Sequence, residues 1–239
     1  MCGRYALIPS QSAWRALGED LGPDMDAVLE QLRGYRERYN VAPSETMPIV
    51  IYDQQTGKPT LIDARWGFIP SWWKQLKPPT KTFNAVSETA SKKPMWRHAW
   101  RHSRCLVPAS LWYEWATNER GEKIPFAFRG PEPGDELMLA GLWDVWHDAV
   151  NGEDVATFAI ITRESEGVVA EVHHRMPLIL APQIWGSWIY PGLNSLRDID
   201  NELARNNLTE LKSYRVKRLT NNSRYKGPDT AEPDEGEDD

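Results

Sequence analysis

The most distinctive chemistry in this sequence lies at its second residue. The chain begins Met1-Cys2-Gly3-Arg4, and removal of Met1 would leave a free α-amine and a thiol within one residue, Cys2. Such an amine has a pKa of about 8 and such a thiol a pKa of about 8.5. Near pH 7, a fraction of the amine is therefore neutral and a fraction of the thiol is ionised, and these are the reactive forms. The amine condenses with an aldehyde to an imine, and the thiol then closes a five-membered thiazolidine. Because most single cysteines are inert, this interpretation depends on the rest of the sequence.

A basic stretch with aromatic residues is the second candidate for chemistry. Residues 92–104 carry five Lys or Arg, two His and no acid, and Trp96 and Trp100 would share one face of a helix. Cations neutralise phosphates and aromatic rings stack on unpaired bases, so the stretch fits single-stranded nucleic acid. The alternative is an amphipathic helix whose tryptophans belong to the core. Trp72 and Trp73 are adjacent in a loop and have the same two interpretations. Their rings could insert between stacked bases, or they could pack over the core.

The elements that must position these residues form a mixed pattern. Strand-like runs cover 47–52, 60–68, 104–115, 124–129, 137–146, 155–163, 176–181 and 214–219. Helix-like stretches cover 11–19, 24–38, 182–190 and 198–206. Because hairpin-like turns outnumber helical crossovers, we predict an α+β fold with a mainly antiparallel sheet and peripheral helices, in one domain over residues 1–225.

Composition limits the class of protein. A chain of 239 residues with two cysteines, Cys2 and Cys105, has no disulfide framework, which fits a reducing cytosol. The N-terminus has no signal-peptide pattern, and no apolar run approaches about 18 residues. We therefore expect a monomeric cytoplasmic protein, associated with the nucleoid in a bacterium or nuclear in a eukaryote.

The net charge of −6 comes from the C-terminal end of the chain. Residues 226–239 contain seven acids and one lysine, whereas residues 1–225 are balanced. A segment this acidic and poor in apolar residues is typical of disorder, so we predict a disordered acidic tail over 226–239.

Short motifs occur in a fixed order along the chain. They cover residues 2–5, 38–43, 65–73, 83–89, 104–109, 112–115, 140–143, 158–162 and 173–177. This series resembles the SRAP (SOS response-associated peptidase) family, whose members crosslink themselves to abasic sites in single-stranded DNA. The resemblance covers roughly residues 2–225.

The resemblance implies roles for four catalytic residues. Cys2 would attack the aldehyde of the ring-opened abasic sugar, and Glu114 matches the glutamate that relays protons. His173 matches the histidine assigned to sugar-ring opening and to reversal of the crosslink, and Asn84 matches the asparagine that positions the amine. On pattern alone, Glu114 could face solvent, and His173 and Asn84 could be structural.

The resemblance also implies DNA contacts. The matching positions are Arg4, Asn40, Trp72, Trp73, Thr162 and Arg175. Val86 stands where many relatives carry an arginine, which removes one phosphate contact. Cys105, in an apolar run, is expected to be a buried structural thiol. No metal and no cofactor is expected.

Two other functions remain open at this point. One is a cysteine peptidase acting on other proteins, and the other is a non-covalent module that binds single-stranded DNA. The expected partner is single-stranded DNA that contains abasic sites, including its junctions with duplex. Met1 would leave either by autocleavage or through an aminopeptidase.

Overall fold

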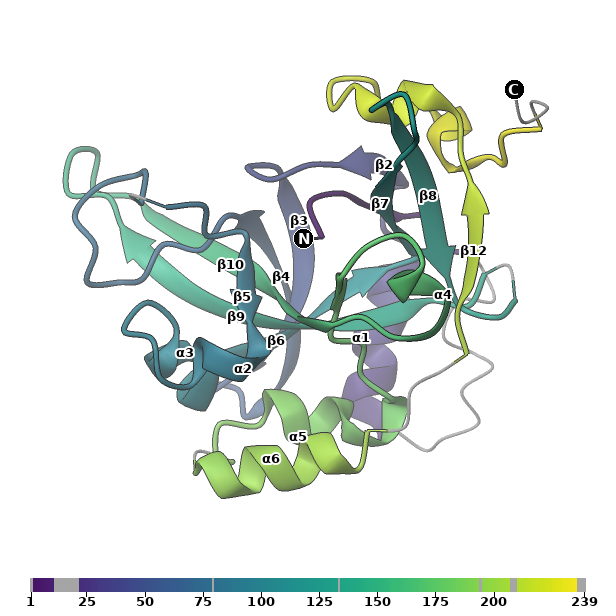
Figure 1. Cartoon of the computed structure of the whole chain (residues 1–239). Coiled ribbons are helices and arrows are strands. Elements are labelled where there is room, and N and C mark those ends of the chain that lie inside the picture. The colour runs from purple at the N-terminus through teal and green to yellow at the C-terminus, as the bar shows by residue number, and fades with distance from the viewer. Residues whose placement is uncertain are drawn as a thin grey trace.

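The computed structural model describes residues 2–10, 22–78, 80–132, 134–193, 195–206 and 210–235, which form two β-sheets flanked by short helices (Figure 1). The described strands are β1 (Tyr5–Leu7), β2 (Arg38–Val41), β3 (Thr46–Asp53), β4 (Lys58–Trp66), β5 (Asn84–Val86), β6 (Arg104–Ala109), β7 (Leu111–Thr117), β8 (Lys123–Arg129), β9 (Leu137–His147), β10 (Asp154–Glu164), β11 (Arg175–Pro177) and β12 (Lys212–Arg215). The described helices are α1 (Pro23–Arg33), α2 (Ser87–Ala90), α3 (Arg97–His102), α4 (Gly167–Ala170), α5 (Trp185–Ile189) and α6 (Leu196–Ala204), with 3-10 turns η2 (Pro182–Ile184), η3 (Arg218–Asn221) and η4 (Pro228–Ala231).

Five strands of the larger sheet close into a small barrel in the order β9-β10-β4-β3-β6. The ring closes because β9 pairs with β6 on one side and with β10 on the other. Apart from Arg104 at its start, β6 is apolar, and it is buried along its whole length. Among the described strands, only the pairings of β10 with β4 and β5 are parallel. The predicted α+β fold with mainly antiparallel strands is confirmed.

The second sheet places the N-terminus between the two halves of the molecule (Figure 1). Its strand order is β12-β8-β7-β1-β2, and all its described pairings are antiparallel. The short strand β1 lies between β2 and β7 and is fully buried. Cys2, which lies three residues before β1, is likewise fully buried.

The helices cover the ends and one side of the sheets. The buried residues of α1 repeat every three or four positions, as in an amphipathic helix packed on one face. Trp100 of α3 is 3% exposed and Trp96, which caps this helix, is 6% exposed. Both tryptophans belong to the core, so the amphipathic-helix alternative holds and neither ring is available for stacking on bases. No helix in the described part of the chain is long and apolar enough to cross a bilayer.

Some element boundaries differ from the sequence-based predictions. The helix expected over 24–38 ends at Arg33, and residues 38–41 form β2 instead. The run 104–115 divides near Ser110 into β6 and β7, which belong to different sheets. The short strands β1, β2 and β5 were not predicted, because three or four residues show no periodicity. The helix expected over 11–19 lies outside the described residues.

The C-terminal segment departs from the predicted disorder over residues 226–235. Thr230 is fully buried, and its carbonyl accepts a hydrogen bond from Thr220 Oγ1 at 3.1 Å. The carbonyl of Ala231 accepts from the Tyr214 hydroxyl at 2.9 Å, and Val216 pairs with Pro233. The folded domain therefore extends beyond residue 225, because acids in this segment pair with basic side chains of the fold. Residues 236–239 lie outside the described part.

Candidate active site

Strand pairing places Cys2 beside Glu114. Tyr5 of β1 pairs with Trp112 of β7, and the Tyr113 N–H donates to the Arg4 carbonyl at 3.0 Å. This contact continues the antiparallel ladder past the end of β1, so Cys2 meets the following part of β7. The Cys2 side chain is fully buried there.

Burial changes the acidity of the Cys2 thiol. It raises the pKa of Cys2 well above the ordinary value, and the negative charge of Glu114 raises it further. The expectation of a partly ionised thiol at neutral pH is therefore wrong for the buried side chain. Any reaction of this thiol as a nucleophile needs a nearby base.

Glu114 has the properties of such a base. It is 2% exposed, so the alternative in which it faces solvent is wrong. Burial raises the pKa of Glu114 to about 7, although the positive charge at the chain's amino terminus opposes the shift. A carboxyl with this pKa exchanges protons readily at neutral pH.

His173 faces Glu114 from the loop between α4 and β11. Its Nε2 lies 3.9 Å from Glu114 Oε2, and its ring is only partly exposed. The N–H and the carbonyl of Arg175 both lie 3.0 Å from Nδ1. When Nδ1 accepts from this N–H, the neutral ring carries its proton on Nε2, toward Glu114. Burial lowers the pKa of His173, which favours the neutral ring at pH 7.

Asn84 lies at the start of β5, next to β10. It is 9% exposed, and its Nδ2 donates to the Ile160 carbonyl at 3.4 Å. Its Oδ1 is buried without a hydrogen-bond partner among the described residues. The contacts of Asn84 within the described chain are thus with β10 rather than with Glu114 or His173.

A pocket of about 540 Å³ opens over Glu114 and His173. Its other lining residues are Arg4, Trp115, Lys123 and Asn221. Lys123 and Asn221 were not predicted, since they reach the pocket through the β7–β8 pairing and the C-terminal segment. The Trp115 indole donates to Asn221 Oδ1 at 2.6 Å, which fixes this wall.

Arg4 is held by the protein at the edge of this pocket. Its guanidinium donates to Asn40 Oδ1 at 2.6 Å and to the Thr220 carbonyl at 2.9 Å. It also lies 5.3 Å from the ring centre of Trp115. These contacts orient its positive charge toward the pocket and leave part of the guanidinium for a ligand.

Two residues expected to contact DNA are buried. Asn40 is 0% exposed, and its Nδ2 donates to the carbonyls of Asn222 and Tyr225 at 3.0 and 2.8 Å. Thr162 is also 0% exposed, with Oγ1 3.5 Å from the Ala85 carbonyl. The structure corrects both expectations, because neither side chain reaches the surface. Asn40 instead fastens the C-terminal segment and positions Arg4.

Arg175 forms a bidentate ion pair with Glu88. Its Nη1 and Nη2 donate to the two carboxylate oxygens of Glu88 at 2.7 and 2.8 Å. The Arg175 side chain holds the pKa of Glu88 down at about 2. A phosphate would have to compete with this carboxylate for Arg175.

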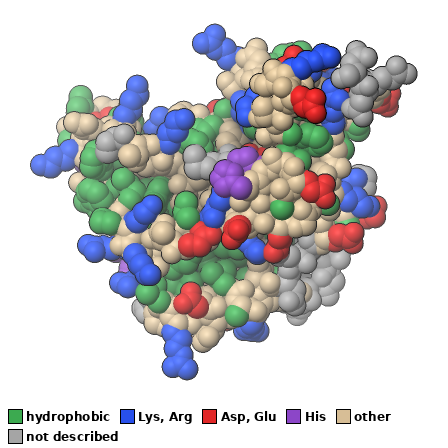
Figure 2. Space-filling view, viewed as in Figure 1, with side chains coloured by type: hydrophobic (Ala, Val, Ile, Leu, Met, Phe, Trp, Pro, Cys, Tyr) green, Lys and Arg blue, Asp and Glu red, His purple; other side chains and the backbone are tan. Residues whose placement is uncertain are grey.

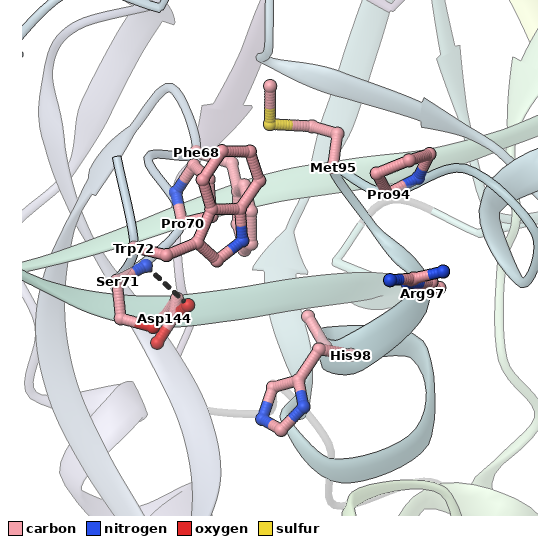
Figure 3. Close-up of a pocket in the computed structure, with 10 residues that line it drawn as sticks. Phe68, Pro70, Ser71, Trp72, Pro94, Met95, Arg97, His98 and Asp144 are labelled. Atoms are coloured by element: carbon pink, nitrogen blue, oxygen red, sulfur yellow. Dashed lines mark hydrogen bonds between the residues drawn. The ribbon is translucent and has the colours of Figure 1, made fainter. Parts of the chain in front are cut away.

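The paired tryptophans differ from each other. Trp72 is 54% exposed, whereas Trp73 is half-buried and its carbonyl accepts from the Trp146 indole at 2.6 Å. Trp72 lines a pocket of about 600 Å³ together with Phe68, Met95 and residues of α3. Figure 3 shows this pocket, in which the Ser71 N–H donates to Asp144 at 2.8 Å. The pocket shares no lining residue with the one at Glu114.

Other sequence expectations have plain outcomes. Cys105 is a free, fully buried thiol packed against Gly141, as predicted. Within the described ranges, no group of three or more His, Cys, Asp and Glu side chains is arranged to hold a metal ion.

Comparison with known proteins gives the family. The family model described as SOS response associated peptidase (SRAP) matches residues 1–223. The abasic site processing protein YoaM of Bacillus subtilis is 32% identical over 221 residues, which cover 92% of this chain and 93% of that protein. The abasic site processing protein YedK of Escherichia coli is 30% identical over 190 residues, 79% of each chain. A crystal structure of a protein from Bacteroides thetaiotaomicron has the same fold, with a TM-score of 0.74, 24% identity and coverage of 98% of this chain and 100% of that one. The chain belongs to the SRAP family.

Proposed function

We propose that this protein processes abasic sites in DNA by forming a covalent bond between Cys2 and the ring-opened sugar. The proposal is supported by the shared family with proteins named for abasic site processing and by three groups: Glu114 and His173, which line one pocket, and Cys2, which is buried beside Glu114. Those groups are a buried thiol, a carboxyl with a pKa of about 7, and a histidine 3.9 Å from that carboxyl. This arrangement of Cys2, Glu114 and His173 is the observation that carries the proposal.

The chemistry follows from removal of Met1. The freed amine of Cys2 adds to the sugar aldehyde, and loss of one water gives an imine. The thiol then adds across the carbon–nitrogen double bond, so that a carbon–sulfur bond forms and the thiol proton ends on nitrogen. The product is a thiazolidine, and no atom is lost in this second step.

Proton transfer falls to Glu114 and His173. The Cys2 thiol is protonated at rest, so Glu114 accepts a proton as sulfur attacks. The neutral His173, with its proton on Nε2, donates toward the sugar oxygen as the ring opens. The amide oxygen of Asn84 is available to accept from the Cys2 amine. The same carboxyl would serve in removal of Met1, which makes autocleavage the proposed route.

Single-stranded DNA is the proposed substrate. The aldehyde must reach a buried thiol, and extruding a sugar from a stacked duplex costs a few kcal/mol. The exposed Trp72 offers a ring for stacking on a terminal base pair, which favours junctions of single strand and duplex.

The test is an adduct that survives denaturation. An abasic single-stranded oligonucleotide is incubated with wild type, Cys2→Ala and Cys105→Ala, and each sample is run on a denaturing gel. Cys2→Ala should give no shifted band, whereas Cys105→Ala should react like wild type, because only Cys2 joins a thiol to the N-terminal amine. A matched duplex should react more slowly.

Three results would contradict the proposal. DNA binding without any adduct would point to a non-covalent binding module, and cleavage of unrelated peptides without an adduct would point to a general peptidase. An adduct that persists in Cys2→Ala would exclude the thiazolidine.

A further inference from the structure

A basic pocket lies next to Asn84 and is separate from the pocket at Glu114. It includes Phe83, which precedes Asn84 in the sequence. It is a pocket of about 380 Å³ between the end of β4, the residues that follow β2 and the loop that leads to β5. Its charged lining residues are Arg65, Lys77 and Lys81, and no acid lines it. We name this pocket, with these three side chains, the β4 basic track.

The cations of the β4 basic track are not neutralised by the fold. Among the described residues, none of the three side chains forms an ion pair or a hydrogen bond with a carboxylate. Lys77 and Lys81 are exposed and Arg65 is half-buried. Lys58 differs in this respect, since it pairs with Asp24 at 2.9 Å. Uncompensated cations gathered in a hollow attract a polyanion.

The wider charge distribution supports a polyanion. Residues 64–103 contain eight Lys or Arg and a single acid, Glu88, which is itself paired with Arg175, although the chain as a whole carries −6. The loop after β4 and helices α2 and α3 lie at the left of Figure 1. There Figure 2 shows many Lys and Arg side chains and few acidic ones.

The ring of Trp66 connects the track to β1, the strand that follows Cys2. Trp66 lines the track, donates from its indole to the Phe83 carbonyl at 2.8 Å, and contacts the Tyr5 ring at 5.2 Å. Tyr5 belongs to β1, three residues after Cys2, and Phe83 precedes Asn84. A ligand in the track therefore lies next to β1 and β5, the strands beside Cys2 and Asn84.

We propose that the β4 basic track binds phosphates of the DNA strand that flank the nucleotide presented to Cys2. This inference rests on the proposed function, which makes a DNA strand the ligand. Phe83, Leu76 and Thr80 supply apolar and hydroxyl surface between the cations, which suits sugars and bases that accompany the phosphates. The track also supplies positive charge beside β5, where Val86 lacks it.

The test uses a double substitution of the two exposed lysines, Lys77→Gln/Lys81→Gln, so that the fold is retained. Affinity for an unmodified single-stranded oligonucleotide is measured by fluorescence anisotropy over a range of KCl concentrations. The slope of log Kd against log salt should fall by about 1.4, since each contact to a single strand contributes about 0.7. The control is Lys58→Gln/Lys212→Gln, which changes the net charge equally but removes lysines paired with Asp24 and Glu132.

Further arms separate this inference from the proposed function. In the double variant, the concentration of abasic DNA that gives half the maximal rate of adduct formation should rise, whereas the control variant should match wild type, because the track binds flanking phosphates. Inorganic phosphate should displace no more DNA than KCl of equal ionic strength, whereas a site for free phosphate would show strong competition. An unchanged slope in Lys77→Gln/Lys81→Gln, or an equal loss in the control, overturns the track. Failure of wild type to form adduct, with the slope change retained, overturns only the proposed function.

Discussion

At the scale of single residues, the pKa of Glu114 sets the expected pH profile. Burial raises this pKa to about 7, so the group changes from acid to base between pH 6 and 8. If Glu114 accepts the thiol proton, wild-type adduct formation rises through pH 7. Glu114→Gln should slow the reaction about 100-fold at pH 7 and remove the inflection, because an amide does not accept the proton.

The measurement is single-turnover adduct formation on abasic DNA from pH 6 to 8. Glu136→Gln is a matched control, because Glu136 is also buried but accepts from Ser110 Oγ at 2.6 Å, away from the pocket lining. Equal rates for wild type and Glu114→Gln across this range would remove Glu114 from the mechanism.

At the scale of elements, the C-terminal segment should contribute to the stability of the fold. Deletion of residues 227–239 removes the carbonyl partners of the Thr220 and Tyr214 hydroxyls and the acidic partners of Lys217 and Arg215. We expect a loss of about 2–3 kcal/mol in the free energy of unfolding by urea. Deletion of residues 236–239 alone is the control, because it leaves these contacts of residues 227–235 in place. Equal urea midpoints for the two truncated chains would show that residues 227–235 contribute nothing.

At the scale of the whole molecule, two buried carboxyl groups should make stability depend on pH. Burial raises the pKa of Glu114 to about 7 and that of Glu136 to about 8, from an ordinary value of 4.5. Each binds more protons in the folded than in the unfolded state across this window. The free energy of unfolding should therefore fall as pH rises from about 4.5 to 8, by on the order of 3–5 kcal/mol per group.

The matching experiment is urea unfolding of wild type and Glu114→Gln/Glu136→Gln at pH 5, 6.5 and 8. The double variant should lose less stability over this range. His173, whose lowered pKa acts in the opposite direction, is present in both proteins and cancels in the comparison. Parallel pH profiles would mean that neither carboxyl has a raised pKa.

The sequence predicts the barrel strands well, because apolar runs separated by turns leave few alternatives. β3 and β4 illustrate this, since their hairpin pairs in register from Thr46 with Arg65 to Asp53 with Lys58. The site is harder to predict. Nothing local shows that β1 enters the middle of a sheet, and its burial changes the acidity of Cys2. Likewise, Lys123 reaches the pocket only through tertiary pairing.

The order of the acidic C-terminal segment could not be predicted from its composition. Its composition is typical of disorder, yet Glu232 pairs with Lys217 at 2.6 Å and Asp234 with Arg215 at 3.3 Å. Lys226 also bonds to the Asn40 carbonyl. The charge composition of the segment does not reveal these contacts, because their partners lie elsewhere in the sequence.

The meeting of the two chain ends also orders events during synthesis. Cys2 is synthesised long before Thr220 and Asn221, which hold Arg4 and the Trp115 wall. A nascent or prematurely terminated chain thus carries the thiol without the finished pocket. The walls of this pocket therefore form only when residues far apart in the sequence fold together, and a fragment that stops before Thr220 cannot complete them.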